Sequence, residues 1–107
     1  MNIPRQYTDM ARQHPKLTGA YEAFGHAVAA AGPLDPKTIA LIKLAISLGA
    51  GLEGAAHSHA RKALASGWSR EQLLHAAHLC APTIGWPGMM RGRGWVLDVT
   101  DPPEKLA

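Results

Sequence analysis

The distribution of apolar residues along the chain predicts a protein made of helices. The strongest segment is residues 36–48, where apolar side chains recur on almost every side of the expected helix. It begins at Asp35-Pro36, a capping carboxylate followed by proline at the first helical position. A helix of this kind is buried on most sides. In a chain of only 107 residues this indicates a subunit interface as well as a core.

Five further helices are predicted from apolar residues spaced three or four apart and bounded by glycine, proline or capping residues. They cover residues 3–13, 18–31, 52–66, 69–81 and 88–99, and residues 82–87 are expected to form a turn. The fold class is therefore all-α, with about five to six helices. We expect one domain over residues 1–100 and a mobile C-terminal tail over residues 101–107.

Composition and charge narrow the function classes. The chain is 47% hydrophobic and 18% charged, with a net charge of +3 and scattered basic residues, so no nucleic-acid partner is predicted. No apolar run approaches the length of a membrane span, and no membrane association is expected. Cys80 is the only cysteine, which excludes an internal disulfide. With an N-terminus that lacks a signal-peptide pattern, this predicts a cytoplasmic protein.

The helix over residues 52–66 carries one histidine on its apolar face. His59 shares that face with Leu52, Ala55, Ala56 and Ala63. Two interpretations remain open: a pocket histidine that moves protons or anchors a ligand, or a buried histidine whose ring bonds a carbonyl.

The other histidines are predicted to be solvated or interfacial. His57 and His59 lie about 160° apart around one helix, so they cannot chelate one ion, and no metal site is predicted. His75 and His78 fall on the polar face of the next helix.

A few other residues are candidates for a site beside His59. Lys43 interrupts an otherwise apolar helix about 60° from the face that carries Ser47. It is either a lysine whose stem reaches solvent or a cation placed for an anionic substrate. Trp86 either closes the pocket or belongs to the core. Cys80 is interpreted as a small core residue and not a nucleophile.

The chain resembles the carboxymuconolactone decarboxylase and alkylhydroperoxidase D superfamily over about residues 34–98. The residues that carry the resemblance are Leu34-Asp35-Pro36-Lys37-Thr38, Leu41-Ile42, Leu44-Ala45-Ile46-Ser47, Gly51, Ser58-His59, Ala63, Gly67, Ser69, Glu71, Leu73 and Gly85-Trp86-Pro87. The resemblance implies an antiparallel helical bundle of the alkylhydroperoxidase D-like type, with an antiparallel helix pair at its centre. It also implies a homo-oligomer, commonly a trimer or hexamer, with its site near an interface.

The chain departs from the peroxidase branch of that superfamily. Ala40 stands at the acidic position, and Leu52 and Ala55 stand at the two cysteine positions, while His59 is kept. A cysteine-dependent peroxidase mechanism is therefore not supported, because its nucleophile is a thiolate.

The decarboxylase branch, which also lacks the cysteines, is the closer match. The resemblance implies a possible carboxy-lyase acting on an anionic substrate, a carboxylated lactone or keto acid, without a cofactor. His59 would be the acid/base, and Lys43, Ser47, Leu52, Ala55 and Trp86 would bind the substrate. The alternative is a non-catalytic, oligomeric member of the family that binds a ligand or a partner.

Overall fold

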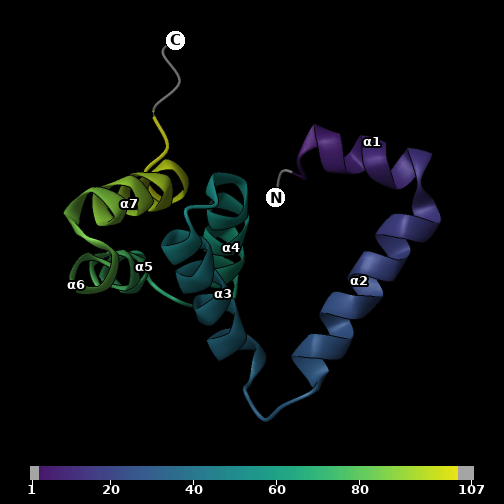
Figure 1. The fold of residues 1–107 in the computed structure, drawn as a ribbon, viewed down its shortest axis with the longest axis horizontal. Helices are drawn as coiled ribbons and strands as arrows, with labels where there is room; N and C mark the ends of the chain where they lie inside the picture. Colours follow the sequence, from purple (N-terminus) through teal and green to yellow (C-terminus); the bar gives the residue numbers. More distant parts are fainter. Residues whose placement is uncertain (1–2, 104–107) are drawn as a thin grey trace. The chain divides into compact units, whose positions relative to one another are not determined.

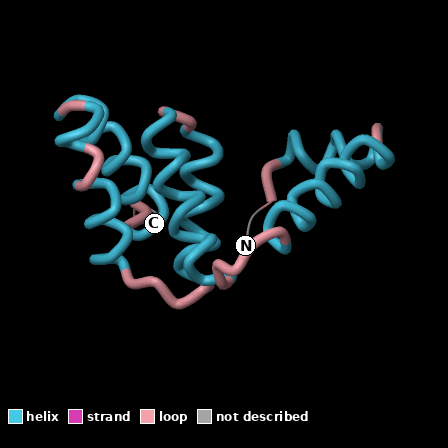
Figure 2. Tube along the Cα trace, turned by 60° about the horizontal axis from the view of Figure 1, so that its bottom comes forward, coloured by secondary structure: helices cyan, strands magenta, loops and turns pink. Residues whose placement is uncertain are grey.

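The computed structural model describes residues 3–103, and this part of the chain is almost entirely α-helical (Figure 1). The helices are α1 (Arg5–Gln13), α2 (Pro15–Ala30), α3 (Pro36–Ala50), α4 (Glu53–Ala65), α5 (Arg70–His78), α6 (Ala81–Ile84) and α7 (Trp86–Thr100). No strand occurs between residues 3 and 103 (Figure 2). The predicted all-α class is confirmed.

The chain divides into two compact units, which we call the N-terminal unit (up to Leu34) and the bundle (from Asp35 onward). In the N-terminal unit, α1 and α2 meet at His14, and Pro15 opens α2 at a position that needs no backbone donor. The Tyr7 hydroxyl of α1 donates a hydrogen bond to the Glu22 carboxylate of α2. Thr18 is the one buried residue of these two helices, so this unit has almost no core of its own.

The hydrophobic core lies in the bundle, where α3 packs along α4 while α4 and α5 pack on α7. Its fully buried members include Leu44 and Leu48 of α3, Leu73 of α5 and Val96 of α7. Burying a side chain of this size stabilises the fold by about 1.5–3 kcal/mol. Helix α4 contributes only alanines to the core. Because these side chains are small, the neighbouring helices can approach α4 closely. The alanines are Ala56, Ala60 and Ala63.

Turn chemistry fixes α3 and α4 as an antiparallel pair. Gly51 ends α3 with φ +72°, and the Leu52 amide donates to the Ser47 carbonyl at 2.9 Å, as in a Schellman motif. At the other end of the pair, the Trp68 indole donates to the Lys37 carbonyl at 2.6 Å. The Lys37 ammonium also lies 4.7 Å from the centroid of that indole ring. The start of α3 is thereby tied to the residues that follow α4.

Several predicted element boundaries were wrong. Helix α2 begins at Pro15, three residues before the predicted start. The helix that Ser69 and Gln72 open with a capping box ends at His78 and not near Ala81. The expected turn over residues 82–87 instead contains α6, and α7 begins at Trp86. Proline explains how α6 and α7 can begin at these positions, because it is tolerated in the first turn of a helix, where its missing N–H has no partner to lose.

Helix α3 is less buried than its composition predicts. Leu44, Ser47 and Leu48 face the core, but Ile42 is 39% exposed and Ile46 is 61% exposed. The second apolar face of α3 is therefore left open by the bundle.

The C-terminal end is described only as far as Pro103, so residues 104–107 of the predicted tail lie outside the described residues. At the start of that tail, the Asp101 carboxylate accepts hydrogen bonds from Nε and Nη2 of Arg70 at 2.6 and 2.8 Å. The last turn of α7 is thereby joined to the first turn of α5.

Candidate functional site

The candidate site is centred on α4, which presents His59 at the edge of the core. The buried face of α4 is formed by Ala56, Ala60 and Ala63, three positions spaced four and three apart. His59 and Ala55 flank this face and are both partly buried. The face of α4 that is buried is therefore rotated slightly around the helix from the predicted face. As a result, the imidazole lies beside the core and not at its centre.

The environment of His59 keeps its ring neutral. Its Nδ1 atom is buried and has no hydrogen-bond partner in the part of the chain that the structure describes. Burial is the main cause that lowers the pKa of His59 below its usual value near 6.5, and the charges of Lys62 and Lys43 lower it further. At neutral pH the ring is therefore a proton acceptor, and one buried nitrogen is left without a bond.

Lys43 and Lys62 act on the same imidazole from two helices. Lys43 belongs to α3 and is partly buried, whereas Lys62 lies three residues after His59 on α4 and is exposed. Residues three apart are neighbours on a helix surface. The charge of Lys43 is one of the causes that lower the pKa of His59, and the role of Lys43 in binding a substrate stays a prediction. Sequence reasoning missed Lys62, although its i,i+3 spacing from His59 was a usable signal.

The structure places the other predicted substrate-binding residues in different surroundings. Ser47 is buried, and its hydroxyl donates to the Lys43 carbonyl at 2.8 Å, so this hydroxyl is already bonded within α3. Leu52 is the residue that precedes α4 and is half exposed. Trp86 is 66% exposed at the start of α7, so the interpretation of this indole as a core residue was wrong.

Two of the remaining histidines bond to α7. Nε2 of His57 lies 2.9 Å from Oδ2 of Asp98, a contact that joins α4 to α7. Nε2 of His78 accepts a hydrogen bond from Nε of Arg93 at 3.2 Å. Within residues 3–103, no group of three or more histidine, cysteine or acidic side chains is arranged to hold a metal ion.

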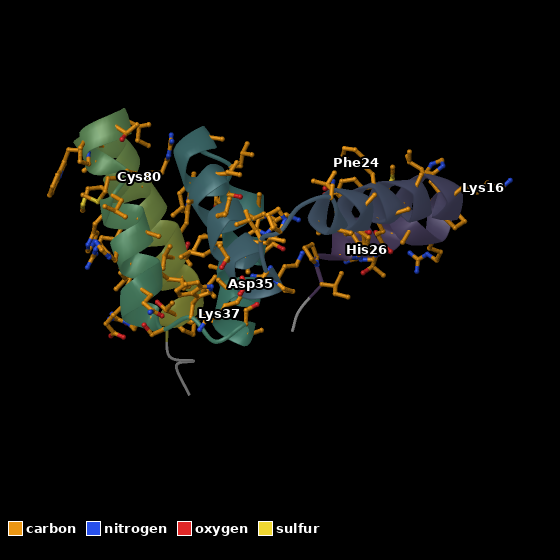
Figure 3. The ribbon with its side chains drawn as sticks, turned by 90° about the horizontal axis from the view of Figure 1, so that it is seen from below. Lys16, Phe24, His26, Asp35, Lys37 and Cys80 are labelled. Atoms are coloured by element: carbon orange, nitrogen blue, oxygen red, sulfur yellow. The ribbon has the colours of Figure 1, made fainter. Side chains whose placement is uncertain are left out.

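Cys80 is partly buried beside α6, with its Sγ atom 3.8 Å from the Ala76 carbonyl. Burial raises the pKa of this thiol, so it is less nucleophilic at neutral pH than an exposed cysteine. Figure 3 shows its position in the bundle.

The model of the carboxymuconolactone decarboxylase family matches residues 15–98, which is most of the chain. The chain belongs to this family. The match begins at the first residue of α2, earlier than the resemblance over residues 34–98 predicted, so the family domain includes α2.

One curated relative is an uncharacterized protein of Haemophilus influenzae, 34% identical over 62 residues. The aligned part is 58% of this chain and 55% of the relative, so the chain spans about half the length of the curated relative it matches. No solved structure matches. Of the described residues, no helix combines the length and the apolar composition needed to cross a membrane.

Proposed function

We propose that this family member is a small carboxy-lyase, in which His59 transfers a proton and Lys43 and Lys62 hold the carboxylate of a carboxylated lactone or keto acid. The observation that carries the proposal is a partly buried imidazole whose buried Nδ1 atom has no hydrogen-bond partner among the described residues, and whose protonation is opposed by burial and by two lysine charges. Perturbed titratable groups of this kind concentrate at functional sites. The lone cysteine and the reducing compartment it suits favour a cytoplasmic location.

The chemistry follows from the charges. Loss of CO₂ leaves the bonding electron pair on the former α-carbon as an enolate, which must then take up one proton. In the free protein, His59 lacks the second, acidic ring proton, because burial and the two lysines disfavour the imidazolium. A carboxylate bound between the lysines offsets their charge and lets His59 gain a proton from solvent. The protonated ring then delivers that proton to the enolate carbon.

A panel of carboxylated lactones and β-keto acids, with released CO₂ as the readout, tests the lyase proposal. We expect His59→Gln to lower kcat by about 10²- to 10⁴-fold on any compound that turns over. His75→Gln is the matched control, because His75 is an exposed histidine of α5. Equal turnover in wild-type and His59→Gln proteins would contradict the proposed role of His59.

The lysines are tested through binding. We expect Lys43→Gln and Lys62→Gln to raise KM more than they lower kcat, since both charges act on the bound carboxylate. Calorimetry in two buffers of different ionisation enthalpy would show proton uptake when a panel compound binds to wild-type protein. The same measurement on His59→Gln should show none.

The second candidate is a non-catalytic member that binds an anionic ligand or a partner. It is favoured by the scarcity of reactive groups: Leu52 and Ala55 are aliphatic, and the Ser47 hydroxyl is bonded to the Lys43 carbonyl. Under this alternative, the panel compounds raise the melting temperature of the protein without releasing CO₂, and the thermal shift depends on Lys43 and Lys62.

A further inference from the structure

Helices α5 and α7 are joined by two side-chain ties of different chemistry. At the first residue of α5, the Arg70 guanidinium donates two hydrogen bonds to the Asp101 carboxylate, just after α7. At the last residue of α5, Nε2 of His78 accepts a hydrogen bond from Nε of Arg93, in the middle of α7. The two helices therefore pack against each other in antiparallel directions (Figure 1).

The two ties respond differently to acid. The pKa of Asp101 is held at about 2, so its carboxylate stays charged at pH 5 and keeps its bonds to Arg70. The bond at His78 needs a ring nitrogen with a free lone pair, which only the neutral imidazole has. A protonated ring carries hydrogen on both nitrogens, so it loses the acceptor and sets a positive charge against the Arg93 guanidinium. Histidine is the side chain that ordinarily changes charge between pH 5 and 8.

No carboxylate near His78 in the sequence compensates for that charge. The chain has no aspartate or glutamate between Glu71 and Asp98. Glu71 lies two helical turns before His78, beside Arg70 at 3.5 Å. Asp98 lies against His57 of α4 at 2.9 Å. Protonation of the His78 ring is therefore answered by repulsion from Arg93 and not by a new ion pair.

The other titratable groups of the bundle offer the protonated ring no acceptor either. His75 precedes His78 by three positions on α5, and α6 contains no titratable side chain. The Cys80 thiol is directed at the Ala76 carbonyl. The remaining charged side chains of α3, α4 and α7 lie elsewhere: Lys37 over the Trp68 ring, Lys43 and Lys62 within the electrostatic reach of His59, Arg91 at Gly51, and Glu53 and Arg61 one turn to either side of His57.

Arg93 lies at the centre of α7 between two glycines, where this helix is weakest. Glycine is the least favourable residue in a helix interior after proline. At Gly92 the reason for glycine is packing, because an added Cβ would lie 3.2 Å from the Leu48 side chain. At Gly94 an added Cβ would meet nothing within 4 Å, so no contact requires glycine there. Gly94 therefore weakens the middle of α7 without any gain in packing.

We propose that the bond between His78 and Arg93 is an acid-released latch over a hinge in α7 formed by residues 92–94. While the His78 ring is neutral, the bond holds the centre of α7 on the end of α5. When the ring is protonated, the bond is lost and the hinge opens. The C-terminal half of α7 stays fixed, because Asp101 keeps its bonds to Arg70 and a protonated His57 carries a charge opposite to that of Asp98.

The opening reaches the turn between α3 and α4. Arg91 belongs to the half of α7 that the latch releases, and its Nη2 atom lies 2.6 Å from a Cβ added at Gly51. Helix α4, which carries His59, begins two residues after this glycine. Acid release of the latch therefore loosens the cover of the turn from which α4 starts. The latch does not depend on the proposed lyase activity, and its test measures backbone opening alone.

Hydrogen exchange followed by NMR for single amides tests the latch, because an amide exchanges when its hydrogen bond opens. Each rate is compared with that of an unstructured peptide at the same pH, which removes the pH dependence of the exchange chemistry. The amides of residues 92–96 report on the hinge, and those of residues 98–100 are the internal reference. From pH 7.5 to pH 5, we expect the protection of the hinge amides to fall by about 3- to 10-fold, the effect of one net hydrogen bond, while the reference amides keep theirs.

Two substitutions at position 78 fix the state of the latch. The glutamine oxygen can accept from Arg93 and does not titrate, so His78→Gln should keep the hinge closed at both pH values. Lysine offers no acceptor and carries a charge throughout this range, so His78→Lys should leave the hinge open at both. His75→Gln is the matched control, because His75 is an exposed histidine of the same helix, and it should keep the wild-type response.

Gly94→Ala tests the hinge independently of the histidine. Alanine favours the helix and its Cβ has open space, so the fall in protection at pH 5 should become smaller, with helix content by circular dichroism equal to wild type or higher. Four results would overturn the latch: equal protection of the wild-type hinge amides at both pH values, a wild-type response in His78→Gln, a loss of the response in His75→Gln, or a fall of the same size at residues 98–100.

Discussion

The turn between α3 and α4 depends on Gly51, and replacing this glycine should change the free energy of unfolding by a measurable amount. Gly51 has φ +72°, a conformation that costs a residue with a side chain about 1–2 kcal/mol. A Cβ atom added there would also lie 2.6 Å from Nη2 of Arg91, although this guanidinium is the end of a flexible chain and can move. We therefore expect Gly51→Ala to lower the free energy of unfolding by about 1–2 kcal/mol.

The assay is urea unfolding at a fixed protein concentration, because association would otherwise shift the apparent stability. Gly54→Ala is the matched control: Gly54 lies in α4, has no positive φ, and an added Cβ meets nothing within 4 Å. This control should be neutral or stabilising by up to about 1 kcal/mol. When Arg91 is first replaced by alanine, Gly51→Ala should still lower the free energy of unfolding. The loss should be smaller only by the amount that the clash with the Arg91 guanidinium contributes.

The reasoning about backbone strain would be refuted by a Gly51→Ala protein as stable as wild type. It would also be refuted if Gly54→Ala lost as much stability as Gly51→Ala. A loss that disappears completely in the Arg91→Ala background would assign the whole effect to the guanidinium contact and none to φ.

Three further predictions concern titration and packing. The charges of Lys43 and Lys62 add to the effect of burial in lowering the pKa of His59, so Lys43→Gln and Lys62→Gln should each raise this pKa. An NMR titration of the His59 ring measures it, and an unchanged titration midpoint in both variants would contradict the electrostatic argument. The hydrogen bonds from Arg70 of α5 hold the folded-state pKa of Asp101 at about 2, below the unfolded value near 3.8. The Asp101 carboxylate therefore stabilises the fold above pH 3.8, and this stabilisation is lost as the pH falls from 3.8 towards 2. In the Asp101→Asn variant, the free energy of unfolding should therefore fall less steeply with decreasing pH below 3.8 than in wild type. The same pH dependence in both proteins would contradict the role of this carboxylate. Leu44→Ala should cost about 2–5 kcal/mol in urea unfolding, since Leu44 is fully buried, and a loss below 1 kcal/mol would contradict its place in the core.

Local sequence signals were enough to locate most helices. Asp35 caps α3 through the Thr38 amide at 2.8 Å, and Ser69 opens α5 with a complete capping box, both as their sequence patterns predict. The region around α6 could not be predicted in the same way. Pro82 and Pro87 are equally compatible with a turn and with the first turn of a helix, so only tertiary packing decides between them.

Contacts between distant positions explain why the site was predicted only in part. His59 was identified from helical periodicity, a local property. On a helix, Glu53 is the i,i+4 neighbour of His57, yet the His57 ring lies against Asp98, which is 41 positions away. No local pattern encodes such a pair. The exposure of Trp86 is likewise set by how α6 and α7 pack, and hydrophobicity alone does not determine it.

The loss of the thiols changes which chemistry the scaffold can support. Positions 52 and 55 hold leucine and alanine instead of cysteine. The chemical groups that remain are the imidazole of His59 and the two lysine charges that act on it, and a bound anion would affect all of them. Burial, and to a smaller extent the charges of the two lysines, lower the pKa of His59 in the free protein. Under the proposed function, a carboxylate bound between the lysines would offset their charge and raise this pKa again. In the proposed mechanism, protonation of His59 is therefore linked to substrate binding, and the proton is in place before the loss of CO₂ creates the carbanion that receives it. Because linkage is reciprocal, a lower pH should tighten the binding of a carboxylate through His59, and the His59→Gln variant should lose this pH dependence while keeping the lysine-dependent part of the affinity.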